Sequence, residues 1–78
     1  MTDNMNDFQH TELNSIKVRN GVGGGWVLQE FGHTMRGDIA VVRCVRFNSA
    51  NKMRRVVEYE IDPRGVSKVV SDDQGPTV

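Results

Sequence analysis

Residues 39–61 read IAVVRCVRFNSANKMRRVVEYEI, and this stretch decides the fold class. Its first part, Ile39 to Phe47, is rich in β-branched residues and apolar on both faces at its start, as expected of a central strand. Its last part, Met53 to Ile61, alternates apolar and charged residues with the period of a half-buried strand. The polar link over residues 48–52 has a suitable length for a hairpin loop, so we predict that the two segments pair antiparallel.

The flanking segments extend this hairpin in both directions. Asp62-Pro63-Arg64-Gly65 has the residue preferences of a type I turn, and a shorter strand is predicted over Val66 to Val70. Upstream, Trp26 to Phe31 indicates another strand, and Leu13 to Arg19 a weaker one that precedes the hairpin signal Asn20-Gly21. The sequence therefore predicts a mainly β protein: an antiparallel meander of four to five strands, forming an open sheet or a small barrel.

The two ends of the chain are more polar than its centre. We predict a polar N-terminal arm over residues 1–12, the antiparallel β domain over 13–70, and a flexible C-terminal tail over 71–78. An alternative for the N-terminal residues is a short helix capped by Asp3 or Asn4, because several apolar residues fall near helical spacing. These residues are Met5, Phe8, Leu13 and Ile16.

Length and composition bound the class of protein. A chain of 78 residues builds one modest core. Its opening, MTDNMNDFQHTELN, is polar and acidic, and no apolar run has the length of a signal peptide or a membrane span, so we expect a cytoplasmic protein with no membrane contact. Its single cysteine, Cys44, cannot form an internal disulfide, which fits a reducing compartment.

Motifs for catalysis or cofactors are weak. The run Gly21 to Gly25 lacks the lysine and the following helix of a phosphate loop, so we interpret it as a flexible loop beside Trp26. The soft metal ligands His10, His33 and Cys44 are scattered without the paired spacing of a zinc site. We therefore expect no enzyme activity, no cofactor and no metal.

The most informative feature is a basic cluster without acidic residues in a chain whose formal net charge is zero. Its members, Arg43, Arg46, Lys52, Arg54 and Arg55, should gather near the loop end of the central hairpin, with Phe47 among them. Arginine beside exposed aromatic residues is typical of protein-interface hot spots, whereas cations with a stacking aromatic can also bind single-stranded nucleic acid. A third interpretation is a solvated surface balanced by Glu58, Glu60 and the acidic N-terminal tail. The residues predicted to bind a partner are Trp26, Arg43, Arg46, Phe47, Lys52, Arg54, Arg55 and Tyr59.

The functional hypothesis follows from the sheet itself, which has more surface than its apolar residues can cover. We expect a non-enzymatic protein-binding module, such as a small inhibitor or adaptor, that docks a sheet face or edge and the basic hairpin on a larger protein with an acidic surface. An origin in a phage or mobile element is a guess from size and character, with no residue that supports it. The alternative is a nucleic-acid-binding protein that uses the same hairpin, and a homodimer is a further option.

Overall fold

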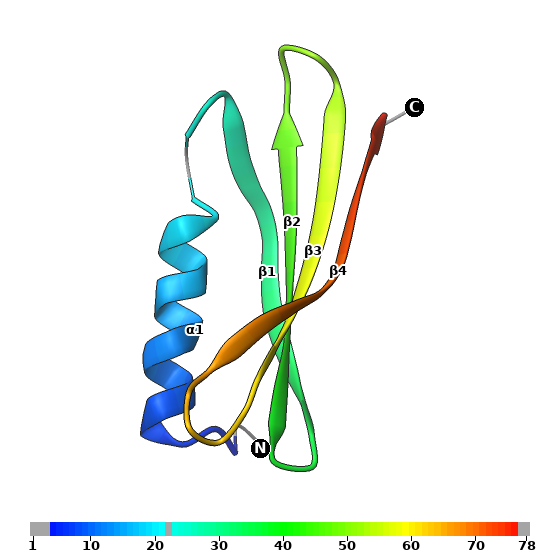
Figure 1. The fold of residues 1–78 in the computed structure, drawn as a ribbon. Coiled ribbons are helices and arrows are strands. Elements are labelled where there is room, and N and C mark those ends of the chain that lie inside the picture. Colours follow the sequence, from blue (N-terminus) through cyan, green and yellow to red (C-terminus); the bar gives the residue numbers. More distant parts are fainter. Residues whose placement is uncertain (1–3, 22, 77–78) are drawn as a thin grey trace.

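The computed structural model describes residues 4–21 and 23–76, which form one helix followed by four antiparallel strands (Figure 1). The elements are α1 (Asp7–Arg19), β1 (Trp26–Arg36), β2 (Ile39–Asn48), β3 (Met53–Ile61) and β4 (Ser67–Pro76). The strands pair in chain order, so β2 and β3 are central and β1 and β4 are the edges. This confirms the prediction of a mainly β antiparallel meander of four to five strands, and of the two predicted forms, an open sheet or a small barrel, the structure has the open sheet.

The central hairpin pairs antiparallel, as predicted. β2 and β3 pair from Ala40 opposite Ile61 to Asn48 opposite Met53 without interruption. β1 is longer than predicted, because it continues to Arg36, which lies opposite Ile39. Gly37 and Asp38 alone make the turn between β1 and β2, and Gly37 adopts the left-handed backbone conformation that such short turns require.

The strand predicted over Leu13 to Arg19 is wrong, because these residues form the second half of α1. The alternative, a short helix, is correct, although its cap is Asn6 and not Asp3 or Asn4. The Asn6 side chain accepts a hydrogen bond from the Gln9 backbone N–H (2.9 Å), and the Gln9 side chain accepts one from the Asn6 N–H (3.0 Å). This capping box starts a helix within the predicted polar arm. Asp3 lies outside the described residues.

The C-terminal segment also differs from the prediction. Residues 71–76 are not a flexible tail but the second half of β4, which pairs with β3 as far as Pro76 opposite Met53. The alternation of an edge strand is hard to detect when both of its faces are exposed. β4 carries charges, a bulge around Val70 and a terminal proline, which are features that protect an edge from pairing with another chain. Residues 77–78 lie outside the described part.

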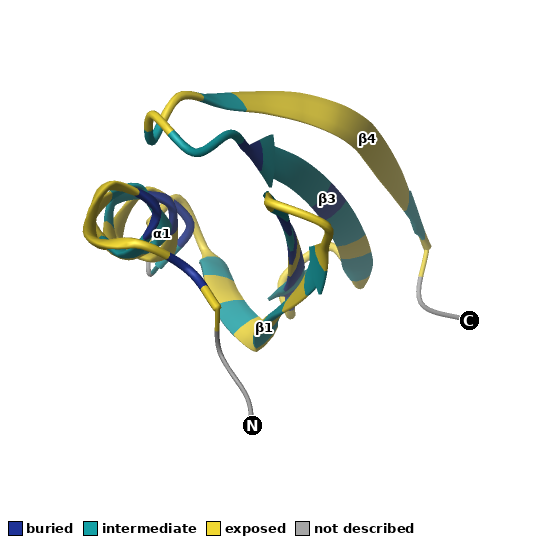
Figure 2. Cartoon of the chain, turned by 90° about the horizontal axis from the view of Figure 1, so that it is seen from below, coloured by how far each residue is buried: buried dark blue, intermediate teal, exposed yellow. Residues whose placement is uncertain are grey.

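The sheet has two unlike faces, and it curves around α1 (Figure 2). The face that packs against the helix is called the helix face, and it carries Ala40, Val42 and Cys44 of β2, which form the core together with Ile16 of α1. The opposite face is called the outer face. It carries the alternate residues of β2, of which Val45 is also fully buried.

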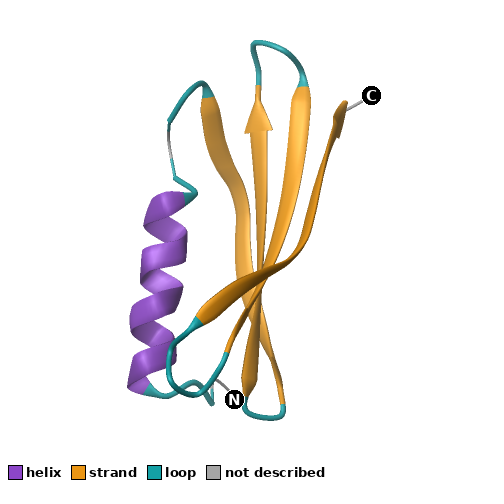
Figure 3. Ribbon diagram, in the orientation of Figure 1, coloured by secondary structure: helices purple, strands orange, loops and turns teal. Residues whose placement is uncertain are grey.

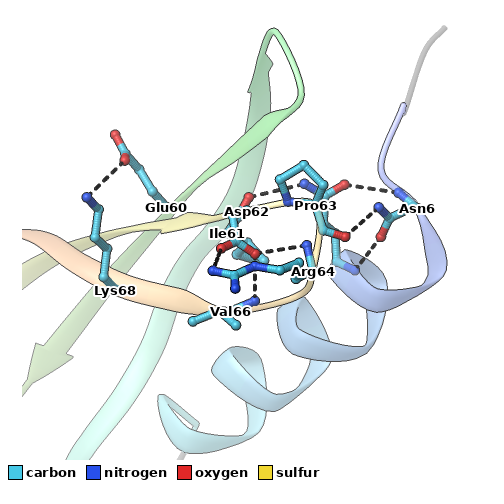
Figure 4. Close-up of polar contacts among 9 residues, drawn as sticks. Asn6, Glu60, Ile61, Asp62, Pro63, Arg64, Val66 and Lys68 are labelled. Atoms are coloured by element: carbon cyan, nitrogen blue, oxygen red, sulfur yellow. Dashed lines mark hydrogen bonds and ion pairs between the residues drawn. The ribbon is translucent and has the colours of Figure 1, made fainter.

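Hydrogen bonds fix the helix to one end of the sheet. The buried Gln9 side chain donates to the carbonyl oxygens of Asp38 (2.8 Å) and Ile61 (3.1 Å), which lie at the two turns of that end. The side-chain amide of Asn6 donates to the Pro63 carbonyl oxygen (2.8 Å) in the predicted turn over residues 62–65 (Figure 4). Since α1 starts here and has only 13 residues, the strands run on past its C-terminal end (Figure 3).

Candidate functional site

The structure divides the predicted partner-binding residues between the two faces of the sheet. Residues opposite each other on neighbouring strands share a face, and residues two apart on one strand do so as well. By this rule the helix face holds Trp26, Arg46, Arg55 and Tyr59, the outer face holds Arg43, Phe47 and Arg54, and Lys52 lies in the loop after β2. The basic cluster therefore does not form one continuous surface.

The helix face has an uncovered portion beyond the C-terminal end of α1 (Figure 1). We call this portion the open end and define it by Trp26, Leu28, Arg46, Met53 and Arg55. Arg46 lies between Leu28 on β1 and Arg55 on β3, directly opposite each. Its guanidinium carbon lies 5.6 Å from the centre of the Trp26 ring, which is within the range of a cation–π contact. All five residues are half-buried.

Arg46 has no acidic partner among the side chains that the structure describes. Its Nε atom is enclosed and has no hydrogen-bond acceptor. Among residues 4–21 and 23–76, no other enclosed side-chain nitrogen or oxygen lacks a hydrogen-bond partner. An enclosed donor without an acceptor costs about 1–3 kcal/mol in its desolvation. Arg46 therefore combines a half-buried positive charge with hydrogen-bonding capacity that the described chain leaves unused.

Arg55 differs from Arg46 because it has a carboxylate partner. Its Nε and Nη2 donate to the two oxygens of Asp72 on β4, at 2.9 Å and 2.6 Å. These hydrogen bonds raise the pKa of Arg55 and lower the pKa of Asp72. The bidentate geometry engages both carboxylate oxygens of Asp72 with one guanidinium, so Arg46 keeps its positive charge uncompensated.

The glycine-rich segment before Trp26 is an ordered turn in its described part. The backbone groups of Gly23 and Trp26 exchange two hydrogen bonds (3.2 and 3.0 Å), and Gly24 and Gly25 between them have positive φ. The buried Asn48 donates to the Gly24 carbonyl (3.4 Å), which connects this turn to β2. The segment joins α1 to β1, so the predicted loop between two strands is wrong, and the turn fixes the backbone of Trp26.

Tyr59 marks the border between the open end and the core. Its hydroxyl accepts a hydrogen bond from the Asn20 side-chain amide (3.1 Å), which also donates to the Ile16 carbonyl (2.8 Å). Asn20 is buried and ends α1. Tyr59 therefore helps to hold the end of the helix on the sheet, and the structure gives its hydroxyl a role within the fold.

The outer face carries the remaining cations in a different setting. Arg43 lies between Glu30 (3.5 Å) and Glu58 (3.9 Å), so two carboxylates offset its charge. Phe47 lies opposite Arg54, which is exposed. An arginine with two acidic neighbours is a poor contact for phosphate, and this leaves the outer face less basic than the sequence suggested.

Cys44 lies on the helix face of β2, two residues before Arg46, and is fully buried in the core. Burial raises the pKa of its thiol, while the charges of Arg46 and Arg19 act in the opposite direction. A buried thiol with a raised pKa is a poor nucleophile. Within the described ranges no three His, Cys, Asp or Glu residues gather as metal ligands, and none of the described helical residues form a helix long and apolar enough to span a membrane.

No family model, curated protein or solved structure matches this chain. The site is therefore assigned from its own side chains. Sequence reasoning missed Asp72, because the segment around it was taken for a flexible tail. It also missed the division of the arginines between two faces, although strict alternation along Arg43 to Phe47 could have indicated it.

Proposed function

We propose that this chain is a non-enzymatic protein-binding module that docks on a larger protein through the open end of its helix face. The observation that carries the proposal is the cation–π contact of Arg46 with Trp26, beside Arg55, at the end of the sheet that α1 does not reach. Tryptophan and arginine are the residues most enriched in interface hot spots, especially where their surroundings exclude part of the water. A small inhibitor or adaptor acts through a contact of this kind.

The partner surface should be acidic. Arg46 contributes a positive charge that no described side chain offsets, and charge complementarity guides encounter and orientation between proteins. We place this activity in the cytoplasm, since the single free thiol of Cys44 suits a reducing compartment.

Nucleic-acid binding is the second candidate, and the exposed Arg54 opposite Phe47 on the outer face favours it. Three features weigh against it. The chain has a formal net charge of zero, its cations are divided between two faces, and Arg43 already has two acidic neighbours. Non-specific affinity for phosphate backbones depends on several uncompensated cations along one surface, and this protein does not present them together.

The experiment is capture of partners by the tagged 78-residue chain from an extract of the organism that encodes it, with and without nuclease. Two arginine variants form a matched pair: Arg46→Glu reverses a charge on the helix face, and Arg54→Glu reverses one on the outer face. We expect nuclease-resistant capture of a protein that is lost with Arg46→Glu and kept with Arg54→Glu. Capture that disappears with nuclease, or that depends on Arg54 alone, would contradict the proposal and favour the nucleic-acid alternative.

A further inference from the structure

We infer that Arg46 is the receptor for a carboxylate, supplied by an aspartate or glutamate side chain of the partner protein. This inference rests on the proposed function and specifies the chemistry of the contact. The terminal nitrogens of the Arg46 guanidinium donate to the two carboxylate oxygens, while the Trp26 ring covers one side of the group.

The first step is the charge balance at the open end. Arg46 and Arg55 lie directly opposite each other, an arrangement in which like charges destabilise a sheet. Asp72 compensates Arg55 through a bidentate contact. One carboxylate for two guanidinium groups leaves one positive charge, and a single carboxylate from the partner would balance it.

The second step is the direction of approach. The Nε atom of Arg46 is enclosed, and the guanidinium makes a cation–π contact with Trp26, while the residue as a whole remains half-exposed. A ligand therefore reaches the terminal nitrogens and not Nε. The planar fork of these nitrogens matches the two oxygens of a carboxylate, and a partly desolvated setting strengthens such a contact.

The third step separates a carboxylate from a phosphate of a nucleic acid. Asp72 lies on the same face, and Asp73 follows it on the outer face of the edge strand β4. Arg55 already compensates Asp72 and Asp73 adds negative charge nearby, so the open end presents one uncompensated guanidinium and not the row of cations that a phosphate backbone requires. A single uncompensated guanidinium thus favours contact with one carboxylate group, which a glutamate side chain of a peptide supplies.

The test uses NMR of the ¹⁵N-labelled 78-residue chain and follows the Arg46 Nε–H signal, identified by its absence in Arg46→Lys. The probe is a tetraglutamate peptide with blocked ends, added at constant ionic strength. We expect a saturable shift of this signal. Binding, followed by backbone amide signals near Trp26, should weaken at least about tenfold in Arg46→Lys, which keeps the charge and loses the fork, and should be unchanged in the outer-face control Arg54→Lys.

A second variant tests the same idea by a gain of affinity. Asp72→Asn releases Arg55 from its partner, so two guanidinium groups then face the peptide, and tetraglutamate should bind several-fold more tightly. The inference is overturned if the wild-type Arg46 signal does not respond, if Arg46→Lys binds as well as wild type, or if Asp72→Asn leaves the affinity unchanged.

Two further ligands identify the competing outcomes. Inorganic phosphate or an eight-residue oligothymidylate that binds more tightly than tetraglutamate at equal ionic strength would overturn the assignment to a carboxylate. If tetraglutamate fails while protein capture still depends on Trp26, the proposed docking surface stands and only the carboxylate contact is wrong. If capture is also independent of Trp26 and Arg46, both proposals fail.

Discussion

Arg46 and Arg55 lie directly opposite each other on the helix face of β2 and β3, and only Arg55 has a carboxylate partner among the described side chains. This relationship makes the open end a place where binding and stability have opposite requirements. An uncompensated, half-buried charge weakens the fold, while the same charge is available to a partner.

Replacement of Arg46 by methionine should therefore separate stability from binding. Methionine keeps an unbranched apolar stem against Trp26 and removes the enclosed Nε donor and the like-charge opposition to Arg55. We expect the free energy of unfolding, measured by urea denaturation, to stay unchanged or rise by up to about 1 kcal/mol, since the lost cation–π contact offsets part of the gain. A decrease of well over about 1 kcal/mol in the free energy of unfolding would show that Arg46 stabilises the fold.

The Arg55–Asp72 pair should make stability depend on pH. The pKa of Asp72 is lowered in the folded protein, so its contribution is fully present above the unfolded pKa and is lost as the pH falls through the folded one. Because both side chains are more than one-third exposed, we expect Asp72→Asn to lower the free energy of unfolding by only about 0.5 kcal/mol at neutral pH.

The measurement is urea denaturation of wild type and Asp72→Asn at neutral pH and at successively lower pH, where the difference should shrink below a pH of about 4. Asp62 also has a lowered pKa, but it is present in both proteins and cancels in the comparison. Asp73→Asn is the matched control on the outer face, and it should change the free energy of unfolding at neutral pH by less than Asp72→Asn does, because its side chain points away from Arg55. If the difference in the free energy of unfolding between wild type and Asp72→Asn is the same in acid as at neutral pH, the role given to the Arg55–Asp72 pair is wrong.

The buried Gln9 should be the strongest single polar contributor to helix docking. Gln9→Ala leaves the Asp38 and Ile61 carbonyl oxygens without their donor, and we expect a loss of about 2 kcal/mol in the free energy of unfolding. Ser15→Ala removes an exposed hydrogen bond to the Thr11 carbonyl and serves as the control, with an effect within about 0.5 kcal/mol. Equal effects of the two substitutions in thermal denaturation would show that Gln9 does not anchor the helix.

Gly65 should tolerate no side chain. It has φ +84°, and a Cβ atom there would lie 2.8 Å from the Phe8 carbonyl oxygen. Gly65→Ala should therefore lower the free energy of unfolding by more than about 1 kcal/mol, because it adds backbone strain to a clash with α1. Gly32→Ala, where a Cβ atom meets nothing within 4 Å, should be close to neutral. Similar melting temperatures for the two variants would contradict the packing of this turn on the helix.

Local patterns predicted the centre of the fold well. The alternation over residues 53–61 and the β-branched run over residues 39–47 predicted β3 and β2, since each pattern reports directly on a face that is buried. The turn Asp62 to Gly65 was predicted from its composition, and the structure places a Gly65 N–H to Asp62 carbonyl hydrogen bond there (2.9 Å).

The ends of the fold were harder to predict. In α1 the apolar residues are few, and the decisive signal is the reciprocal Asn6–Gln9 contact, which competes with a weak strand pattern. In β4 almost every residue is exposed, so burial imposes no pattern. The pairing of Asp72 with Arg55, and hence the uncompensated charge of Arg46, depends on this strand. Local sequence patterns therefore could not predict it.

The most direct test of the central claim compares two aromatic residues on opposite faces of the sheet, with the captured partner and isothermal titration calorimetry. Trp26→Ala should weaken binding by about 30-fold, or about 2 kcal/mol, as expected of a hot-spot residue, while Phe47→Ala should change it by less than about threefold. The reverse result, with Phe47 critical and Trp26 dispensable, would show that the partner docks on the outer face and would contradict the account.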